Sequence, residues 1–309
     1  MTEAILEGRS LYHPISKRNM FWRRIATAFF RWPIAPADIH VFPDSTDRAS
    51  ELIKEGYSIW FLGTHPTKRE GLELIARPLQ YVKELAQLSM VMPISLHQFL
   101  KERSAIDPLS EMTGVTAAPV ANEDAMEQQE FIRAILGRDV KLGEGIQQYA
   151  RLIREAFVHG SGAGIAPQGG RRKTLELDQA KHRAIEFLIR KNRIKRGDKL
   201  AFLFISMGPG YNADYEKVYD KFNIFKKWNV TFLRTITLDE MYDMLDRANE
   251  ILADSPVELG KVEITLDELA LIILSLPMDD NYNKIPKGYQ ALLSSFEEFV
   301  GVMEAIREM

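Results

Sequence analysis

A histidine followed five positions later by a glutamate is the strongest candidate for chemistry in this sequence. His65 and Glu70 lie in the segment Gly63-Thr64-His65-Pro66-Thr67-Lys68-Arg69-Glu70, directly after an apolar run that predicts a buried strand. A carboxylate bonded to one ring nitrogen of a histidine fixes the tautomer, and the other nitrogen becomes a better base for a hydroxyl proton. The pair therefore predicts general-base chemistry on an alcohol, although an isolated match of this kind also fits a structural histidine.

A second segment has the composition of a phosphate-binding loop. The sequence Ala166-Pro167-Gln168-Gly169-Gly170-Arg171-Arg172-Lys173-Thr174 places two glycines directly before three cations. Glycines leave backbone N–H groups exposed to an anion, and arginine and lysine side chains bind phosphate oxygens. The segment predicts a site for a phosphate monoester, and a glycine turn with a solvated basic face is the simpler alternative.

Both segments are expected at the ends of buried strands. Apolar runs predict strands at Tyr57–Leu62, Ile165–Pro167 and Leu200–Ser206, and the intervening sequences have the period of helices. This alternation predicts an α/β fold with a single, largely parallel sheet flanked by helices. Open α/β sheets bind ligands beyond the carboxyl ends of their strands, so this position favours a functional role for both segments.

The rest of the chain extends the same pattern. Further strands are expected at Ile39–Phe42, Leu88–Leu96 and Val230–Arg234, and helices at Thr46–Lys54, Leu72–Leu85, Gly145–Phe157, Ala180–Lys191, Ala213–Lys227, Leu238–Ala253 and Lys287–Arg307. A turn is expected at Gly160–Gly164, and residues 104–122, which lack a clear period, predict a long surface loop or insertion. We therefore expect an N-terminal amphipathic segment (1–36), an α/β domain (37–255) and a C-terminal helical extension (256–309).

The N-terminal segment has the composition of a membrane-surface helix. Between Lys17 and Trp32, apolar residues recur at helical spacing among five cations, which are Lys17, Arg18, Arg23, Arg24 and Arg31. Basic residues beside phenylalanine and tryptophan suit an anionic bilayer interface. A helix that packs on the protein core is the alternative, because aromatic faces are commonly buried inside proteins.

Composition argues against several classes of function. The chain has 309 residues, of which 46% are hydrophobic, and a net charge of -3, so no overall basic field indicates nucleic-acid binding. The basic run Arg190–Lys199 lacks interleaved aromatic residues and is interpreted as a solvated helix end. Cysteine is absent, and the scattered histidines His13, His40, His97, His159 and His182 are interpreted as structural or surface residues. Neither a metal site nor a redox cofactor is predicted, and a cytoplasmic location is expected.

The order and setting of these motifs resemble the glycerol-phosphate and lysophosphatidate acyltransferase superfamily, over about residues 57–210. The first motif of that family is a His, four residues and then Asp or sometimes Glu after a buried strand, which His65 and Glu70 match. Three further segments resemble family motifs: Lys83-Glu84-Leu85, Phe131–Asp139 with Arg138 in the phosphate-binding place, and Ala166–Arg171 in place of Phe-Pro-Glu-Gly-Thr-Arg. Gln168 stands where the family usually has Glu, and Gly170 where it usually has Thr.

The resemblance implies transfer of a fatty acyl group from acyl-CoA or acyl carrier protein to the hydroxyl of a glycerol phosphate or lysophospholipid. His65 would be the general base and Glu70 its orienting carboxylate, while Arg138, Gly169, Gly170 and Arg171 would bind the phosphate. Further expected site residues are Thr64, Lys68, Lys83, Gln168, Arg172 and Lys173. The protein would be peripheral on the inner face of the membrane. The departures at Gln168 and Gly170 suggest an alternative, a non-catalytic lipid-binding or membrane-associated protein on the same fold.

Overall fold

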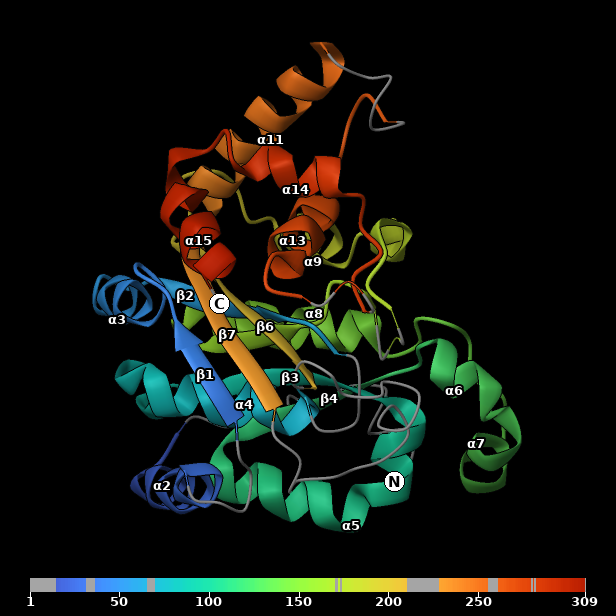
Figure 1. Cartoon of the computed structure of the whole chain (residues 1–309). Coiled ribbons are helices and arrows are strands. Elements are labelled where there is room, and N and C mark those ends of the chain that lie inside the picture. The colour runs from blue at the N-terminus through green and yellow to red at the C-terminus, as the bar shows by residue number, and fades with distance from the viewer. Residues whose placement is uncertain are drawn as a thin grey trace.

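A seven-stranded sheet between two layers of helices organises the computed structural model (Figure 1). The structure describes residues 15–31, 37–65, 70–169, 172, 174–209, 228–254, 261–278, 280 and 282–308. The strands are β1 (Ala37–Val41), β2 (Ser58–Gly63), β3 (Met90–Ser95), β4 (Val115–Val120), β5 (Gly162–Ile165), β6 (Leu200–Pro209) and β7 (Trp228–Thr237). Their order across the sheet is β1-β7-β6-β2-β5-β3-β4.

Five of these strands run in one direction. The neighbouring pairs among β6, β2, β5, β3 and β4 are parallel, whereas β7 is antiparallel to β6 and β1 is parallel to β7. The predicted α/β class with a largely parallel sheet is confirmed. Because parallel strands end at one edge, the loops that follow β2, β3, β4, β5 and β6 begin along the same edge of the sheet.

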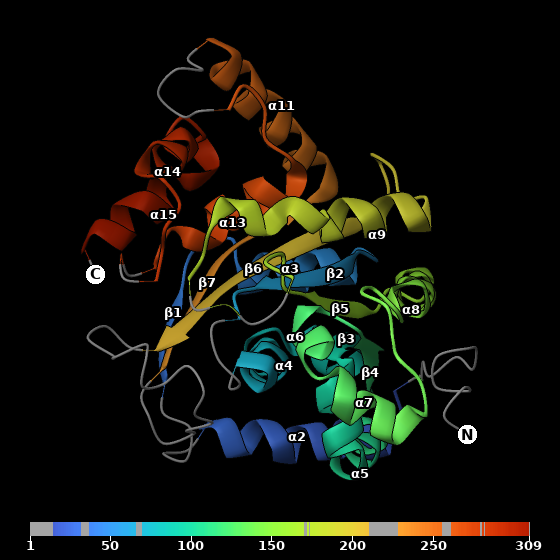
Figure 2. The same ribbon diagram turned by 90° about the vertical axis from the view of Figure 1, so that its right-hand side faces the viewer.

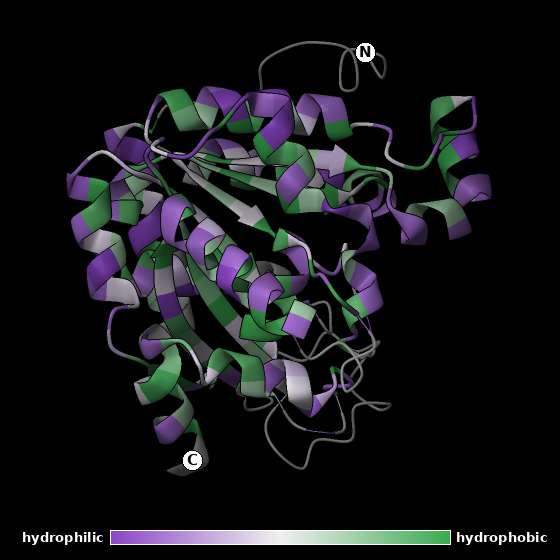
Figure 3. Ribbon diagram, turned by 90° about the horizontal axis from the view of Figure 1, so that it is seen from above, coloured by the Kyte–Doolittle hydropathy of each residue, from purple (hydrophilic) through white to green (hydrophobic). Residues whose placement is uncertain are grey.

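Helices cover both faces of the sheet (Figure 2). One layer contains α8 (Ile146–Val158), α9 (Ala184–Asn192), α11 (Leu238–Asp254) and α13 (Leu266–Ser275), with α14 (Lys287–Leu293) and α15 (Glu297–Glu308) packed on it. The other contains α2 (Lys17–Arg31), α3 (Thr46–Lys54), α4 (Glu70–Tyr81), the short helix η1 (Lys83–Gln87) and α5 (Leu96–Thr113). These helices carry hydrophilic and hydrophobic residues together (Figure 3), as expected where only one face meets the core.

The central strand β2 explains why its sequence is a continuous apolar run. Trp60 and Leu62 pack in the cluster with α8, α9 and α13, whereas Ile59 and Phe61 pack in the cluster on the opposite face. A strand that is covered on both faces needs apolar residues at successive positions rather than at alternate ones. A Cβ atom on Gly162 of β5 would lie 2.6 Å from the ring of Phe61, so the small residue makes room for the large one.

The sequence interpretation of residues 104–122 as a loop is wrong. Helix α5 continues to Thr113, and residues 115–120 form β4, the edge strand of the sheet. In α5 only Leu96 and Phe99 are buried, so its sequence shows little apolar period. Strand β4 has the sequence VTAAPV, in which small residues are buried beside a proline that an edge strand tolerates.

Other predicted elements differ mainly at their ends. The N-terminal helix and the helix at Thr46–Lys54 are confirmed, and the predicted C-terminal helix is divided into α14 and α15. The turn expected at Gly160–Gly164 is wrong, because β5 begins at Gly162. The predicted helix at Ala213–Lys227 lies outside the described residues. Within the described ranges, no helix is both long and apolar enough to cross a bilayer.

Two helices in one layer cap each other. The carboxylate of buried Asp267, in α13, accepts hydrogen bonds from the backbone N–H groups of Ile185 (2.8 Å) and Glu186 (3.1 Å) at the start of α9. In return, the Glu186 carboxylate accepts one from the N–H of Leu266 (3.0 Å) at the start of α13. Burial raises the pKa of Asp267 to about 7, against the opposing effect of the two backbone hydrogen bonds.

The raised pKa of Asp267 predicts a pH-dependent contribution to stability. The folded state binds the proton of this carboxyl more tightly than the unfolded chain does, so its contribution is full below about pH 4 and is lost as pH rises through about 7. We expect the free energy of unfolding of the wild type, relative to Asp267→Asn, to fall by up to about 1.4 kcal/mol per pH unit in this window. Urea unfolding at several pH values measures it. A difference between the two proteins that does not change with pH would contradict this account.

Candidate active site

Thr64 fixes the end of β2 immediately before His65. Its buried hydroxyl donates a hydrogen bond to the carbonyl oxygen of Met207 (2.7 Å) and accepts one from the N–H of Met207 (2.7 Å) in β6. The preceding Gly63 lies so close to α4 that a Cβ atom there would be 2.5 Å from Leu74. His65 follows this anchored position, half-buried, with its Nδ1 atom inaccessible to solvent.

Several predicted site residues lie outside the described part of the structure. They are Lys68, Gly170, Arg171 and Lys173, together with the side chain of Glu70. The backbone of Glu70 begins α4, five positions after His65 in the sequence. Orientation of His65 by Glu70, and phosphate binding by Gly170 and Arg171, therefore stay predictions.

The loop after β5 meets the loop after β2. Its first residues turn through a hydrogen bond from the N–H of Gly169 to the carbonyl of Ala166 (2.9 Å), with Gly169 at a φ of +75°. The backbone N–H of Arg172 then donates to the carbonyl oxygen of His65 (3.2 Å). Two segments about a hundred residues apart in sequence are thus joined beside the candidate base, as their adjacent parallel strands lead one to expect.

Gln168 belongs to the interior of this loop rather than to its surface. Its side chain is only 1% exposed, and its Nε2 atom lies 3.4 Å from the hydroxyl of Tyr282, which comes from the C-terminal part of the chain. The Gln168 Oε1 atom is buried and has no hydrogen-bond partner among the described atoms. The amide at this position therefore packs against the layer that contains α13.

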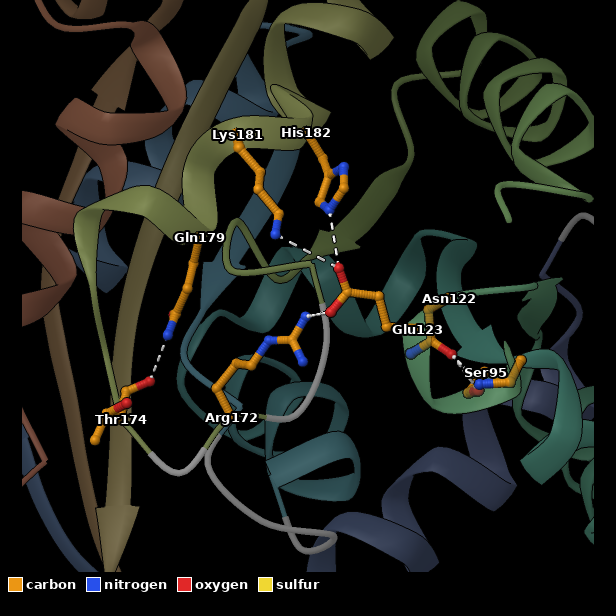
Figure 4. Close-up of polar contacts among 9 residues, drawn as sticks. Ser95, Asn122, Glu123, Arg172, Thr174, Gln179, Lys181 and His182 are labelled. Atoms are coloured by element: carbon orange, nitrogen blue, oxygen red, sulfur yellow. Dashed lines mark hydrogen bonds and ion pairs between the residues drawn. The ribbon is translucent and has the colours of Figure 1, made fainter. Parts of the chain in front are cut away.

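Glu123 contacts the side chains of an arginine, a lysine and a histidine at the same edge (Figure 4). It begins α6 (Glu123–Glu127), which starts soon after β4. Its carboxylate accepts a hydrogen bond from the Arg172 guanidinium and lies 3.4 Å from Nε2 of His182 and 3.7 Å from Nζ of Lys181. The hydrogen bond from Arg172 is the largest effect that lowers the pKa of Glu123 below its ordinary value.

The ends of β3 and β4 are also linked by side chains. The Ser95 hydroxyl donates to Oδ1 of Asn122 (2.6 Å), and Ser95 Oγ lies 2.8 Å from Nδ1 of His97. Asn122 Oδ1 also accepts from the N–H of Ala125 (3.1 Å), which caps the start of α6. Asn122, the residue before Glu123, is therefore bonded both to the end of β3 and to the first turn of α6.

Two predicted site residues lie in other surroundings. Arg138 follows α7 (Gln129–Leu136) and forms an ion pair with Glu144 (2.6 Å), in the part of the chain that projects from the body beside α6 (Figure 1). Lys83 begins η1, whose Glu84 pairs with Lys54 (3.1 Å) at the end of the helix that precedes β2. Lys83 thus lies towards the amino ends of the parallel strands, at the opposite edge from His65. A phosphate-binding role for Arg138 stays a prediction.

No protein-family model matches the chain, and no curated protein sequence matches it either.

The described side chains at this edge offer a base and cations. Across the residues that the structure describes, no group of three or more His, Cys, Asp or Glu side chains is arranged to hold a metal ion. An imidazole such as that of His65 can take a proton. The cations of Arg172 and Lys181 lie at the same edge, where both contact Glu123. Proton transfer is the chemistry that the described groups could perform.

Sequence reasoning missed Glu123, Ser95 and Asn122, and it interpreted His182 as a structural or surface residue. A signal was present, because Asn122-Glu123-Asp124 has the pattern of a helix cap followed by acidic residues. The prediction of a loop over residues 104–122 misses β4. Without that strand, nothing in the sequence places Asn122 and Glu123 at the carboxyl edge of the sheet.

The two hydrogen bonds of Thr64 predict a stability effect. Thr64→Val keeps the side-chain shape but leaves the N–H of Met207 without its acceptor, so we expect a loss of about 1–3 kcal/mol in the free energy of unfolding. Urea unfolding measures the loss. Thr113→Val is the control, because the Thr113 hydroxyl bonds only to a carbonyl of its own helix near the surface, and a change within about 0.5 kcal/mol is expected. Equal losses in both variants would contradict the role assigned to Thr64.

Proposed function

We propose that this protein is an O-acyltransferase that moves a fatty acyl group from an acyl thioester to the hydroxyl of a glycerol phosphate or lysophospholipid. The observation that carries the proposal is the hydrogen bond between the His65 carbonyl and the N–H of Arg172. It brings the segment with the candidate base next to the segment rich in glycine and cations. A base beside a phosphate-binding loop is what acylation of a phosphorylated alcohol requires.

The proposed reaction needs only a proton shuttle and two bound substrates. His65 takes the proton of the acceptor hydroxyl as its oxygen attacks the thioester carbonyl. A carbon–oxygen bond forms, the carbon–sulfur bond breaks, and the proton passes from His65 to the departing thiolate. Glu70 orients the imidazole, while Gly169, Gly170, Arg171 and Lys173 contact the phosphate, with Arg138 as a further proposed ligand. Acyl-CoA or acyl carrier protein supplies the thioester.

The alternative is a lipid-binding protein without catalysis. It is favoured by Gln168, an amide at the position where the acyltransferases that the sequence resembles usually carry a glutamate. Burial of Gln168 against Tyr282 supports a packing role for this position, which is compatible with either function.

The proposal predicts that activity depends on His65. Purified protein is incubated with glycerol 3-phosphate, or a lysophospholipid, and radiolabelled acyl-CoA, and ester formation is measured. Loss of a general base typically lowers the rate about 10²- to 10⁴-fold, so His65→Gln should abolish measurable product. His159→Gln should retain activity, because His159 is exposed at the end of α8. Background product from both the wild type and His65→Gln would favour the lipid-binding alternative.

We also propose that the protein binds the membrane surface through α2. The supporting observation is that this helix buries an arginine and exposes two large apolar side chains. Arg23 is 1% exposed and donates hydrogen bonds to the carbonyl oxygens of Thr113 and Leu88 (both 2.5 Å), whereas Phe21 is 58% and Ile25 45% exposed. Burial lowers the pKa of Arg23 to about 10, so the guanidinium stays charged at neutral pH. Exposed apolar side chains flanked by the exposed cations Arg18 and Arg24 suit an anionic bilayer.

The membrane proposal predicts reduced binding on loss of two apolar side chains. Phe21→Ser/Ile25→Ser should weaken co-sedimentation with anionic liposomes at least about tenfold, since burial of each side chain contributes about 1.5–3 kcal/mol. The matched control is Val158→Ser/Val262→Ser, because both valines are exposed elsewhere on the molecule (71% and 62%). Equal pelleting of the two double variants would contradict the assignment of α2 as the membrane-binding element.

A further inference from the structure

A chain of polar contacts crosses the carboxyl edge of four adjacent strands, β2, β5, β3 and β4. It begins with the carbonyl of His65, which accepts a hydrogen bond from the N–H of Arg172 (3.2 Å). The Arg172 guanidinium then donates to Glu123, as Figure 4 shows. From the adjoining Asn122 the chain continues to the hydroxyl of Ser95 (2.6 Å) at the end of β3. Each strand of this part of the sheet thereby contributes one link.

Glu123 contacts three side chains, and its backbone lies in the capped first turn of α6. It is the first residue of α6, directly after the cap formed by Asn122. Its Oε2 atom receives Arg172, and its Oε1 atom faces both Lys181 (3.7 Å) and His182 (3.4 Å) in the short helix η2 (Leu177–His182). One carboxylate therefore holds both ends of the segment 172–182.

The charge of Glu123 balances the cations that surround it. Arg172 and Lys181 both contact this one carboxylate. Without its negative charge, the two cations would lose these ion pairs and their mutual repulsion would be uncompensated. A hydrogen bond to an ionised acceptor is also stronger than one to a neutral amide or carboxylic acid. Replacement of the charge of Glu123 should therefore release Arg172 first, because its bond is the closest.

We infer that Glu123 is a positioning residue for His65, acting through Arg172. The inference rests on the proposed function, in which His65 is the base. Glu123 anchors the Arg172 side chain, and the Arg172 backbone holds the carbonyl of His65. Loss of the anchor lets the loop after β5 move away from the loop after β2. The imidazole and the glycine turn that begins at Ala166 then lose their fixed separation.

The first test observes the His65 ring without any substrate. The 309-residue chain contains six histidines, and the ring signals of His65 are identified in NMR spectra by their loss in His65→Gln. Glu123→Gln should change both the chemical shifts and the titration midpoint of His65, and Glu123→Asp should give an intermediate change. Asp139→Asn is the matched control, because Asp139 pairs with Arg133 (2.7 Å) on the exposed part of the chain after α7, and its loss should leave His65 unaltered. His65 signals identical in the wild type and in Glu123→Gln would overturn the inference.

The second test uses the acyl transfer reaction and a second variant. Arg172→Met removes the guanidinium but keeps the backbone N–H, so it should reproduce the effect of Glu123→Gln. Misplacement of a reacting group by about 1 Å can lower a rate about 100-fold, and we expect kcat to fall roughly 10- to 100-fold with little change in the KM for the acyl donor. The double variant should be no slower than the slower single variant. Additive losses in the double variant would overturn the inference.

The two tests separate the inference from the proposed function. If the wild type forms no ester, the proposed function fails, and the His65 signals still decide whether Glu123 positions this residue. If the wild type is active and Glu123→Gln retains full kcat with unchanged His65 signals, only the inference fails. Thermal unfolding of each variant confirms that the protein compared is folded.

Discussion

The packing of β2 is the constraint on which the candidate site depends. This strand is buried on both faces between β5 and β6, and its last residue before His65 is locked to β6 by the two hydrogen bonds of Thr64. The histidine thus follows a strand that is buried on both faces and fixed at its end. The loops that face it come from neighbouring strands of the same sheet, so their positions follow from strand order and parallel direction rather than from contacts with one another alone.

Polar contacts at the sheet edge then refine what the backbone provides. The loop after β5 contains the sequence Gly169-Gly170, and glycine restricts the backbone less than other residues do. Hydrogen bonds to His65 and to Glu123 restrict it, and they engage the backbone and the side chain of the same residue, Arg172. The proposed base and the proposed phosphate-binding loop are in this way held together although they belong to different segments.

The sequence predicts the parts of this structure whose signals are local. The apolar run of β2 reveals a strand that is covered on both faces, and it correctly places His65 at a strand end. Strand β4 escapes prediction because an edge strand of alanine, valine, threonine and proline has no pattern that differs from a loop. The strand predicted at Ile165–Pro167 exists as β5 but begins earlier, at Gly162, where the glycine-rich sequence predicts a turn. Glu123 could not be paired with Arg172 from sequence, since their proximity depends on the order β5-β3-β4 across the sheet. Arg138 is predicted as a phosphate ligand from the order of the motifs alone. Its ion pair with Glu144 could not be foreseen from the sequence.

Arg23 gives α2 a second role beyond any contact with lipid. Its guanidinium satisfies carbonyl groups of Thr113 and Gly114 where α5 ends, and those of Leu85 and Leu88 around η1. These oxygens belong to the turns that lead into β4 and β3, so α2, the first helix among the described residues, caps elements far along the sequence. A shortened chain that lacks α2 would leave these carbonyl groups without the Arg23 donor. Strands β3 and β4 would then lose order at their amino ends, so a truncation intended to test membrane binding would also disturb the sheet.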